Sequence, residues 1–163
     1  MKLKLTYLIS ILLLFIYSCQ QNSDKKINIS NKTEEYLVIA DTIINDIMLK
    51  AAENDEWAEY SLRKLDKLRL VNEIFDLVYE GKLTPYEFFS ETPLTIEDIK
   101  QLERDPEFSR DKIAKVQFEE GWYFDPVSLK MTKRVHSIML AFEIYNNQGE
   151  IKGYKPAFKV YLK

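Results

Sequence analysis

The strongest constraint in this sequence is a run of eleven residues, Val135 to Tyr145, in which large apolar side chains alternate with smaller or more polar ones. Successive side chains of a β-strand point to opposite faces, so a period of two indicates a strand with one buried face. The first set is His136, Ile138, Leu140, Phe142 and Ile144, and the second is Val135, Ser137, Met139, Ala141 and Glu143. We therefore predict a central strand here, with Ile138 and Leu140 nearly fully buried.

Turn-forming residues separate this run from a strand-like run on each side. The aromatic run Trp122–Asp125 ends at Pro126, which has no N–H for a sheet ladder and biases the residue before it to an extended or turn conformation. Asn146–Gly149 follows the central run, and Asn and Gly can both take a positive φ. In the last run, Gly153 and Pro156 suggest a bulge or an edge position. The three runs predict a small antiparallel β-meander.

The residues before the meander have the spacing of helices. Thr33 is a candidate N-cap, and Gly81 has the place of the residue that follows a helix C-terminus. Thr95 and Asp98 have the spacing of a capping box, and a bend or break is expected around Leu70. Helices are predicted over about residues 34–53, 57–80, 95–104 and 109–119. Because helices lead and strands follow, the predicted class is α+β, with N-terminal helices followed by a small antiparallel β-meander.

The N-terminus has the pattern of a secretory signal. Lys2 and Lys4 precede an apolar run that is shorter than the roughly 20 residues of a membrane-spanning helix. The end of this run, 16–19, resembles a lipoprotein signal, in which Cys19 would be acylated and become the first mature residue. An uncleaved anchor, or a plain signal peptide with an incidental cysteine, are the alternatives. The expected organisation is a signal peptide over 1–18, a lipidated N-terminus and polar tether over 19–32, and a single α+β domain over 33–163.

Composition excludes several classes of protein. Apolar residues make up 46% of the chain and charged residues 30%, which favours a packed core over disorder. The formal net charge is −3, and without Lys2 and Lys4 the predicted mature part holds 21 basic and 26 acidic residues. A basic stripe for nucleic acid is therefore not expected. Cys19 is the only cysteine, so no intramolecular disulfide is possible.

The sequence offers few groups for chemistry. His136 is the only histidine, and at an inward position of the central strand it is expected to be a satisfied or edge-facing residue rather than a catalyst. Glu119, Glu120 and Asp125 are carboxylates beside aromatics, a combination that could hydrolyse a glycoside but also fits a solvated turn and a helix end. No metal-ligand spacing, phosphate loop or Ser-His-Asp set is present, so we expect no catalytic residues, metal or cofactor.

Tyrosines offer a candidate partner surface instead. On a strand, Trp122 and Phe124 share one face and Tyr123 points to the other. The simplest interpretation makes two of these three aromatics part of the core. The alternative is that Tyr123, Tyr154 and Tyr161 form a partner-facing aromatic patch.

The C-terminal region resembles a known family. The spacings Glu120-x-Trp122-x-Phe124-Asp125, Gly149-Glu150-x-x-Gly153-Tyr154-x-Pro156 and Glu80-Gly81-Lys82-Leu83-Thr84-x-Tyr86 are similar to those of GldN/PorN proteins, over roughly residues 70 to 163. These are periplasmic ring proteins of the type IX secretion and gliding machinery. The resemblance implies a structural protein, not an enzyme, whose partners are other envelope proteins of a secretion or gliding complex.

Localisation follows from the lipoprotein-like signal. Gln20, which is not acidic, follows Cys19, and in lipoproteins this favours the outer membrane, with the domain expected on the periplasmic face. The competing hypothesis, from a different functional class, is a glycan-binding or hydrolytic envelope lipoprotein that stacks sugars on Trp122, Tyr123 and Phe124.

Overall fold

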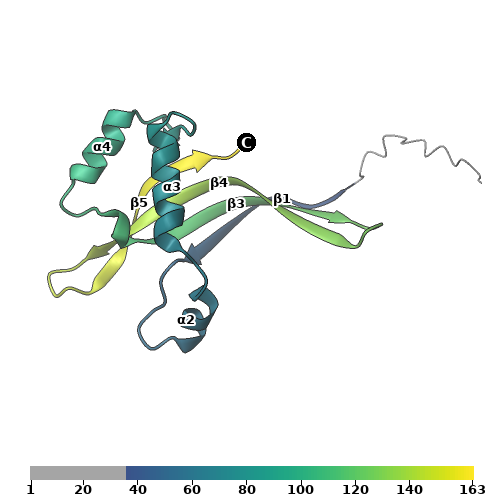
Figure 1. Ribbon diagram of the computed structural model, residues 1–163, viewed down its shortest axis with the longest axis horizontal. Coiled ribbons are helices and arrows are strands. Elements are labelled where there is room, and N and C mark those ends of the chain that lie inside the picture. The colour runs from purple at the N-terminus through teal and green to yellow at the C-terminus, as the bar shows by residue number, and fades with distance from the viewer. Residues whose placement is uncertain (1–35) are drawn as a thin grey trace, which may run out of the picture. The chain divides into compact units, whose positions relative to one another are not determined.

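The computed structural model describes residues 36–163 (Figure 1). The predicted signal peptide, Cys19 and tether lie outside the described residues. Most of the described chain belongs to one antiparallel sheet of five strands in the order β1-β3-β4-β5-β2. The strands are β1 (Leu37–Met48), β2 (Pro85–Tyr86), β3 (Ile113–Asp125), β4 (Lys130–Tyr145) and β5 (Ile151–Tyr161).

The predicted α+β layout, with N-terminal helices followed by a meander, is wrong. The described chain begins with strand β1, and its helices lie between β1 and β3. β1 occupies most of the helix predicted over 34–53 and pairs antiparallel with β3. Half of its twelve residues are β-branched, a composition that favours a pleated strand over a helix. The molecule is therefore dominated by its sheet, with three short helices added.

Two helices, α2 (Glu56–Leu62) and α3 (Lys67–Tyr79), replace the single predicted helix over 57–80. The break lies before Leu70, where Asp66 caps α3 by accepting a hydrogen bond from the Arg69 N–H at 3.0 Å. The C-terminus of α3 is as predicted, because Gly81 has a φ of 71°. The Gly81 N–H donates to the Val78 carbonyl and the Lys82 N–H to the Leu77 carbonyl, which is a Schellman motif.

The third predicted helix is confirmed and the fourth is wrong. α4 (Ile96–Arg104) begins with the expected capping box between Thr95 and Asp98. The predicted helix over 109–119 is reduced to the 3-10 turn η1 (Arg110–Lys112), after which β3 begins. Ile113 and Val116 both face the core from this strand, paired with Phe142 and Leu140 of β4.

The meander exists, as predicted, with longer strands. The turn between β4 and β5 has Gly149 at a φ of 83° and a hydrogen bond from its N–H to the Asn146 carbonyl. Register shifts in the β4–β5 pairing lie beside Gly153 and Pro156, which confirms the expected bulging of this strand. The first half of β5 is also an edge, because β2 pairs only with Lys159 and Val160.

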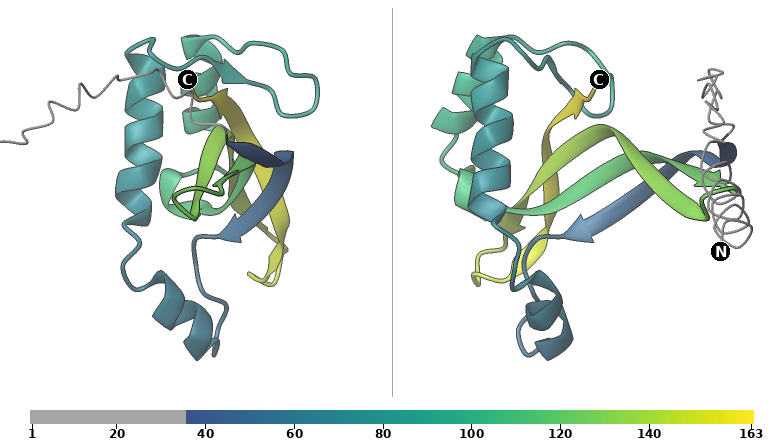
Figure 2. Two further views of the ribbon diagram at one scale, coloured as in Figure 1. Left: turned by 90° about the vertical axis from the view of Figure 1, so that its right-hand side faces the viewer. Right: turned by 45° about the vertical axis from the view of Figure 1, so that its right-hand side comes forward.

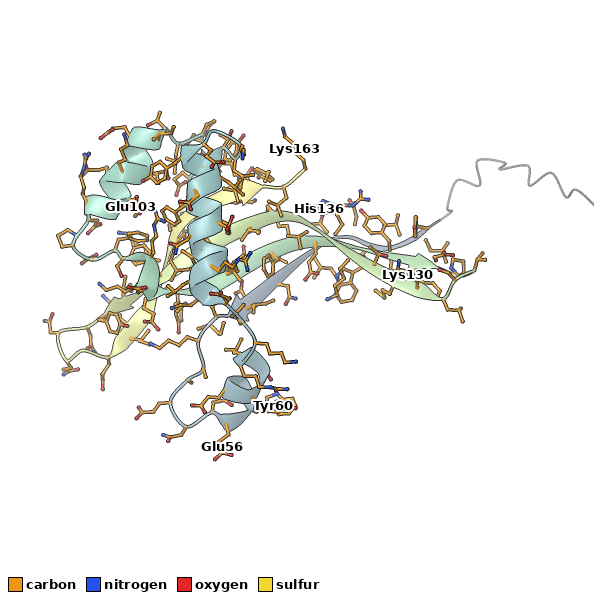
Figure 3. All side chains as sticks on the ribbon, in the orientation of Figure 1. Glu56, Tyr60, Glu103, Lys130, His136 and Lys163 are labelled. Atoms are coloured by element: carbon orange, nitrogen blue, oxygen red, sulfur yellow. The ribbon has the colours of Figure 1, made fainter. Side chains whose placement is uncertain are left out.

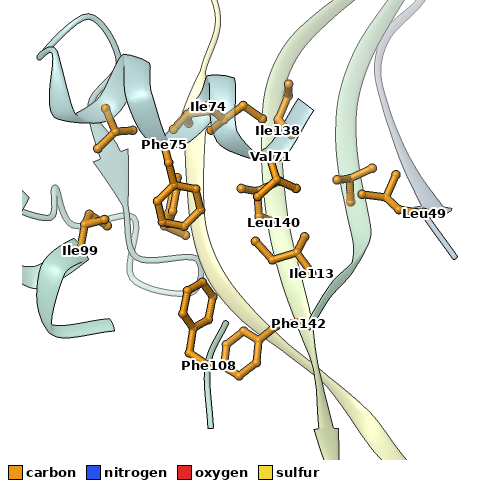
Figure 4. Packing of buried hydrophobic residues seen from close by; sticks show 14 residues of the cluster. Leu49, Val71, Ile74, Phe75, Ile99, Phe108, Ile113, Ile138, Leu140 and Phe142 are labelled. Carbon is orange, nitrogen blue, oxygen red and sulfur yellow. The ribbon is translucent and has the colours of Figure 1, made fainter. Parts of the chain in front are cut away.

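The core lies between α3 and one face of the sheet (Figures 2 and 4). Val71, Ile74, Phe75 and Val78 point inward from α3, at helical spacing. Aromatic rings join the layers, with Phe75 edge-on to Phe158 at 5.0 Å between centroids. Leu140 and Phe142 are completely buried and Ile138 is nearly so, which confirms the predicted inward face of the central strand. Within residues 36–163, no helix is long and apolar enough to cross a membrane.

Candidate functional site

The strand register places the three predicted partner tyrosines on one face of the sheet, opposite α3. Paired residues of neighbouring strands share a face, and Tyr154 pairs with Glu143 while Tyr161 pairs with Ser137. Ser137 in turn pairs with Glu119, and Tyr123 lies four residues further along β3. We call this the open face, because α3 and the apolar core lie on the other side of the sheet (Figure 2).

These tyrosines do not form one patch. Tyr154 is 37% exposed and Tyr161 is 39% exposed, whereas Tyr123 is half-buried. Tyr154 pairs with Glu143 of β4, and Tyr123 pairs with Thr132 of the same strand. The two tyrosines are therefore eleven strand residues apart, which is about 36 Å at the usual rise per residue. The predicted surface therefore divides into separate regions of one face.

A buried charge cluster occupies the middle of the open face. The Lys159 side chain is only 5% exposed, and its Nζ lies 2.7 Å from Glu119 Oε1 and 3.1 Å from Glu91 Oε1. The Ser137 hydroxyl donates to Glu119 at 2.8 Å, and the Tyr161 hydroxyl donates to Glu91 at 3.0 Å. Burial by itself would lower the pKa of Lys159, but its hydrogen bonds with these neighbours outweigh burial and raise that pKa. Tyr161 thus belongs to this cluster.

A hollow of about 580 Å³ lies at one end of the open face, beside Tyr154. On its wall, Lys50 Nζ lies 3.1 Å from the buried carboxylate of Glu143, and the Tyr145 hydroxyl donates to the same carboxylate. The hydrogen bond with Glu143 raises the pKa of Lys50 and that of Tyr145. The hollow is also lined by small or apolar residues and by exposed acids, namely Met48, Ala51, Ala52, Glu53, Asp55, Ala58, Glu59, Gly149 and Ile151.

Tyr123 and His136 lie together at the other end of the face. A Cβ on Gly121 would come within 2.8 Å of both the His136 Nε2 and the Tyr123 hydroxyl, so the two side chains close over this glycine. The Arg134 guanidinium lies 5.5 Å from the centre of the Tyr123 ring. The expected inward position of His136 is wrong, because a register shift at this point of the β3–β4 pairing turns its side chain to Gly121 and Tyr123 on the open face.

The three carboxylates considered for glycoside hydrolysis do not converge. Glu119 and Glu120 are consecutive on β3, and Glu119 is held by Lys159. Glu120 accepts from the Asn45 amide at 2.9 Å and lies 3.6 Å from Lys133, which together lower its pKa. Asp125 instead accepts hydrogen bonds in the following turn. Among residues 36–163, no group of three or more His, Cys, Asp and Glu side chains is placed to hold a metal ion.

Sequence reasoning missed the pairs that organise this face. Glu143 and Lys159 are buried charges with partners from distant segments, Lys50 and Glu91. The available signal was a charged residue at an interior position of an otherwise apolar strand, which requires a buried partner. The partners themselves were not evident, because both lie in segments whose path depends on the fold.

Comparison with known proteins bears on the whole domain. The sequence model of the family described as "Gliding motility associated protein GldN" matches residues 32–163. No match was found among curated proteins. The family match covers the described domain, including both ends of the open face. The chain therefore belongs to the GldN family and is a component of the gliding and type IX secretion machinery, which is associated with the cell envelope.

Proposed function

We propose that this protein is a lipid-anchored, non-catalytic scaffold of the envelope machinery, and that it holds a partner protein at the open face. The single observation that carries the proposal is the family match over residues 32–163. The geometry does not favour the alternative of glycoside hydrolysis, since Glu119, Glu120 and Asp125 are each engaged in separate structural contacts. The proposed partners are other ring-forming proteins of the secretion and gliding complex.

The hollow beside Tyr154 is the proposed centre of the partner surface. It combines a partly exposed aromatic with small apolar side chains, and interfaces concentrate binding energy in such aromatic anchors. Glu53, Asp55 and Glu59 on its lining are exposed acids. Charge complementarity therefore favours a partner segment that carries Lys or Arg. Tyr123 and Tyr161 lie on the same face but apart from the hollow, and we propose them as separate contacts with the partner.

The proposed anchor is acylated Cys19 in the outer membrane, with the domain on the periplasmic face. It is supported by the lipoprotein-like end of the apolar run and by Gln20 after the cysteine. A protein with two or more acyl chains is held stably on a bilayer, because each buried methylene contributes about 0.8 kcal/mol. Labelled palmitate should be incorporated into the wild-type chain and lost in Cys19→Ala, which should also leave the membrane fraction. Persistent labelling of that variant would refute lipidation at Cys19.

The partner surface is tested by substitutions that keep the fold. Tyr123→Ala and Tyr154→Ala should retain near-native thermal melts while co-purification of envelope partners from the native host falls. Tyr161→Ala should lower the melting temperature as well, because Tyr161 bonds to Glu91 and packs edge-on against Tyr86. Phe89→Ala is the matched control, since Phe89 is an exposed aromatic in a different loop.

The outcomes separate the competing hypotheses. If Tyr123→Ala and Tyr154→Ala both unfold, these tyrosines are core residues and the interface lies elsewhere. If both fold and still co-purify with their partners like Phe89→Ala, the proposed surface is wrong. Variants that keep their protein partners but lose binding to a glycan would support the alternative of a glycan-binding lipoprotein.

A further inference from the structure

The sheet extends beyond the helices as a three-stranded arm. It consists of 37–40 of β1, 120–125 of β3 and 130–135 of β4, with the turn 126–129 at its tip (Figure 1). The Asp125 carboxylate holds this turn by accepting from the Val127 N–H at 2.8 Å and from the Ser128 hydroxyl at 2.6 Å. The arm therefore ends in a well-formed hairpin, and no helix of the described chain packs on that end (Figure 3).

The tip presents large apolar side chains to solvent. Val127 is 75% exposed, Leu129 is 77% exposed, and Met131 is the next apolar residue along β4. Beside them, the first residues of β1 are also exposed, and Leu37 pairs with Phe124. Contiguous exposed apolar groups of this kind mark an interaction site in a soluble domain.

Leu129 is unusual in its backbone as well as in its exposure. Its φ of 54° lies in the left-handed region, where a side chain costs about 1–2 kcal/mol and where Gly or Asn is the usual choice. Packing within the described chain does not offset that cost, because most of the side chain is in solvent. Leu129 is the last residue of the hairpin loop, where a left-handed residue is common, so its conformation belongs to the turn and its exposed side chain adds to the apolar tip.

The arm is layered from its tip toward the sheet. The apolar tip comes first, and Phe124, Tyr123 and Trp122 follow it along β3. Lys133 and Arg134 then pair with Trp122 and Gly121, two to three residues beyond Met131. At about 3.3 Å per residue, these cations lie roughly 7–10 Å behind Met131. Behind the turn, Asp125 pairs with Lys130, Phe124 lies beside Met131, and Trp122 lies beside Lys133. An apolar tip that is backed by aromatics and cations is what a lipid headgroup boundary favours over a depth of about 5–10 Å.

The connection to the N-terminal segment favours the same occupant. Residue 36 leads directly into β1, whose first residue pairs with Phe124, so the chain enters the domain beside the hairpin tip. Sixteen residues, 20–35, separate Cys19 from this point, which limits their span to at most about 55 Å. If Cys19 is acylated, as proposed above, the lipid is attached to the strand that forms one edge of the arm, within that span of its tip.

We propose that the hairpin tip inserts into the headgroup boundary of an anionic lipid bilayer. Val127, Leu129 and Met131 enter the apolar side of that boundary, while Arg134 contacts lipid phosphates. Lys133, which is half-exposed and lies 3.6 Å from Glu120, adds its positive charge at the same level. Lys130, next to the tip, extends its ammonium back toward the headgroups, as lysines at an interface do. Asp125 stays engaged with the turn. The tip thus sets the orientation of the domain on the membrane. Acylation at Cys19 alone would not fix that orientation.

The test uses the full mature chain with Cys19→Ser, which contains no cysteine and no lipid. A single new cysteine at Leu129→Cys is labelled with the environment-sensitive dye NBD, and vesicles of phosphatidylglycerol and phosphatidylethanolamine are added. We expect the emission to shift to the blue and to be quenched by lipids brominated in their acyl chains. The same label at Phe89→Cys is the matched control, because Phe89 is equally exposed but lies on another loop.

Unlabelled variants test the energetics of the same contact. In vesicle flotation of the Cys19→Ser chain, Leu129→Gly should keep or raise the melting temperature, because Gly relieves the left-handed backbone. The same variant should lower vesicle binding at least fivefold, and Arg134→Gln should lower it and weaken its salt dependence. Absence of an NBD shift, or equal shifts at positions 129 and 89, would overturn the proposal. Tip-dependent recovery of a protein partner, without vesicle binding, would overturn it in favour of a protein pocket.

Discussion

The buried ion cluster on the open face gives the sharpest energetic prediction. Lys159 is buried, whereas Glu119 keeps about a quarter of its side chain exposed and Glu91 more than half. Removing one member of a fully buried pair costs about 3–5 kcal/mol, because the other charge is left without compensation. For Glu119→Gln the partly exposed position reduces this cost, and we expect a loss of about 2–4 kcal/mol in the free energy of unfolding.

Lys159→Met should be milder, because methionine fills the buried slot with an apolar chain of similar length. The remaining Glu119 keeps its bond from Ser137 and some contact with water, so the expected loss is about 1–3 kcal/mol. The double variant should lose less than the sum of the two, with a coupling of about 1–3 kcal/mol for groups in direct contact.

Urea unfolding monitored by circular dichroism measures these differences directly. For a domain of this size, each kcal/mol corresponds to about 3–5 °C in the melting temperature, so thermal melts give a second estimate. Glu91→Gln is the control, since Glu91 is an exposed member of the cluster and its loss should have little effect. Losses that add within about 0.5 kcal/mol would show that Lys159 and Glu119 are not coupled, and would refute this reasoning.

Three further predictions concern the same domain. Leu140→Ala and Ile138→Ala should each cost about 2–5 kcal/mol of unfolding free energy, and a urea midpoint that barely moves in both would contradict the face assignment. Gly121→Ala should cost about 1–3 kcal/mol by overpacking against side chains 2.8 Å away, whereas Gly153→Ala, with its nearest atom at 4.0 Å, should be close to neutral in the same melts. The lowered pKa of Glu120 gives stability that is present above about pH 4.3 and is lost as the pH falls, so a pH series of melts should fall less steeply in Glu120→Gln than in wild type.

The sequence predicted the pairing of β4 with β5 and two helix ends well, because the signals for these features are local. Alternation in 137–145 gives the inward face of β4, whereas a register shift reverses Val135 and His136. The turn at Asn146–Gly149 is formed by the residues that favour it. The capping box at Thr95 and the glycine at position 81 also act within one helical turn. Such features need no knowledge of distant segments.

Both wrong helices have the same physical origin, which is a β-bulge. The extra residue of a bulge moves the next inward side chain from two positions along the strand to three. In β1, a register shift lies between Ala40 and Ile43, and both are partly buried. In β3, a shift after Ile113 leaves Ile113 and Val116 on the same inward face. A spacing of three within a run of apolar residues resembles a helix, although the β-branched content of β1 favoured a strand.

The candidate site was less predictable, because it depends on strand order. The sequence placed Tyr123 on the opposite face from Trp122, and the register agrees, but it did not indicate that Tyr154 and Tyr123 lie far apart on that face. The distance arises from the length of β4, whose sixteen residues exceed the predicted eleven. The five additional residues at its start build the arm, and with it the exposed tip at Leu129.

The buried side chains on the two faces of the sheet are stabilised by different interactions, and this difference helps to distinguish effects on folding from effects on binding. The face under α3 is closed by apolar packing, whereas the open face satisfies its buried charges internally, as Glu143 does with Lys50 and Tyr145. A partner in the hollow therefore need not desolvate the Glu143 carboxylate, which is already paired. The exposed acids of the lining, Glu53, Asp55 and Glu59, remain for a basic segment of that partner. A substitution of Glu143 would disrupt the contacts with Lys50 and Tyr145 and would reduce stability and binding together. Such a variant therefore cannot locate the interface. Tyr154 lines the same hollow with a partly exposed ring, and a loss of binding in Tyr154→Ala without a loss of stability would locate the interface there.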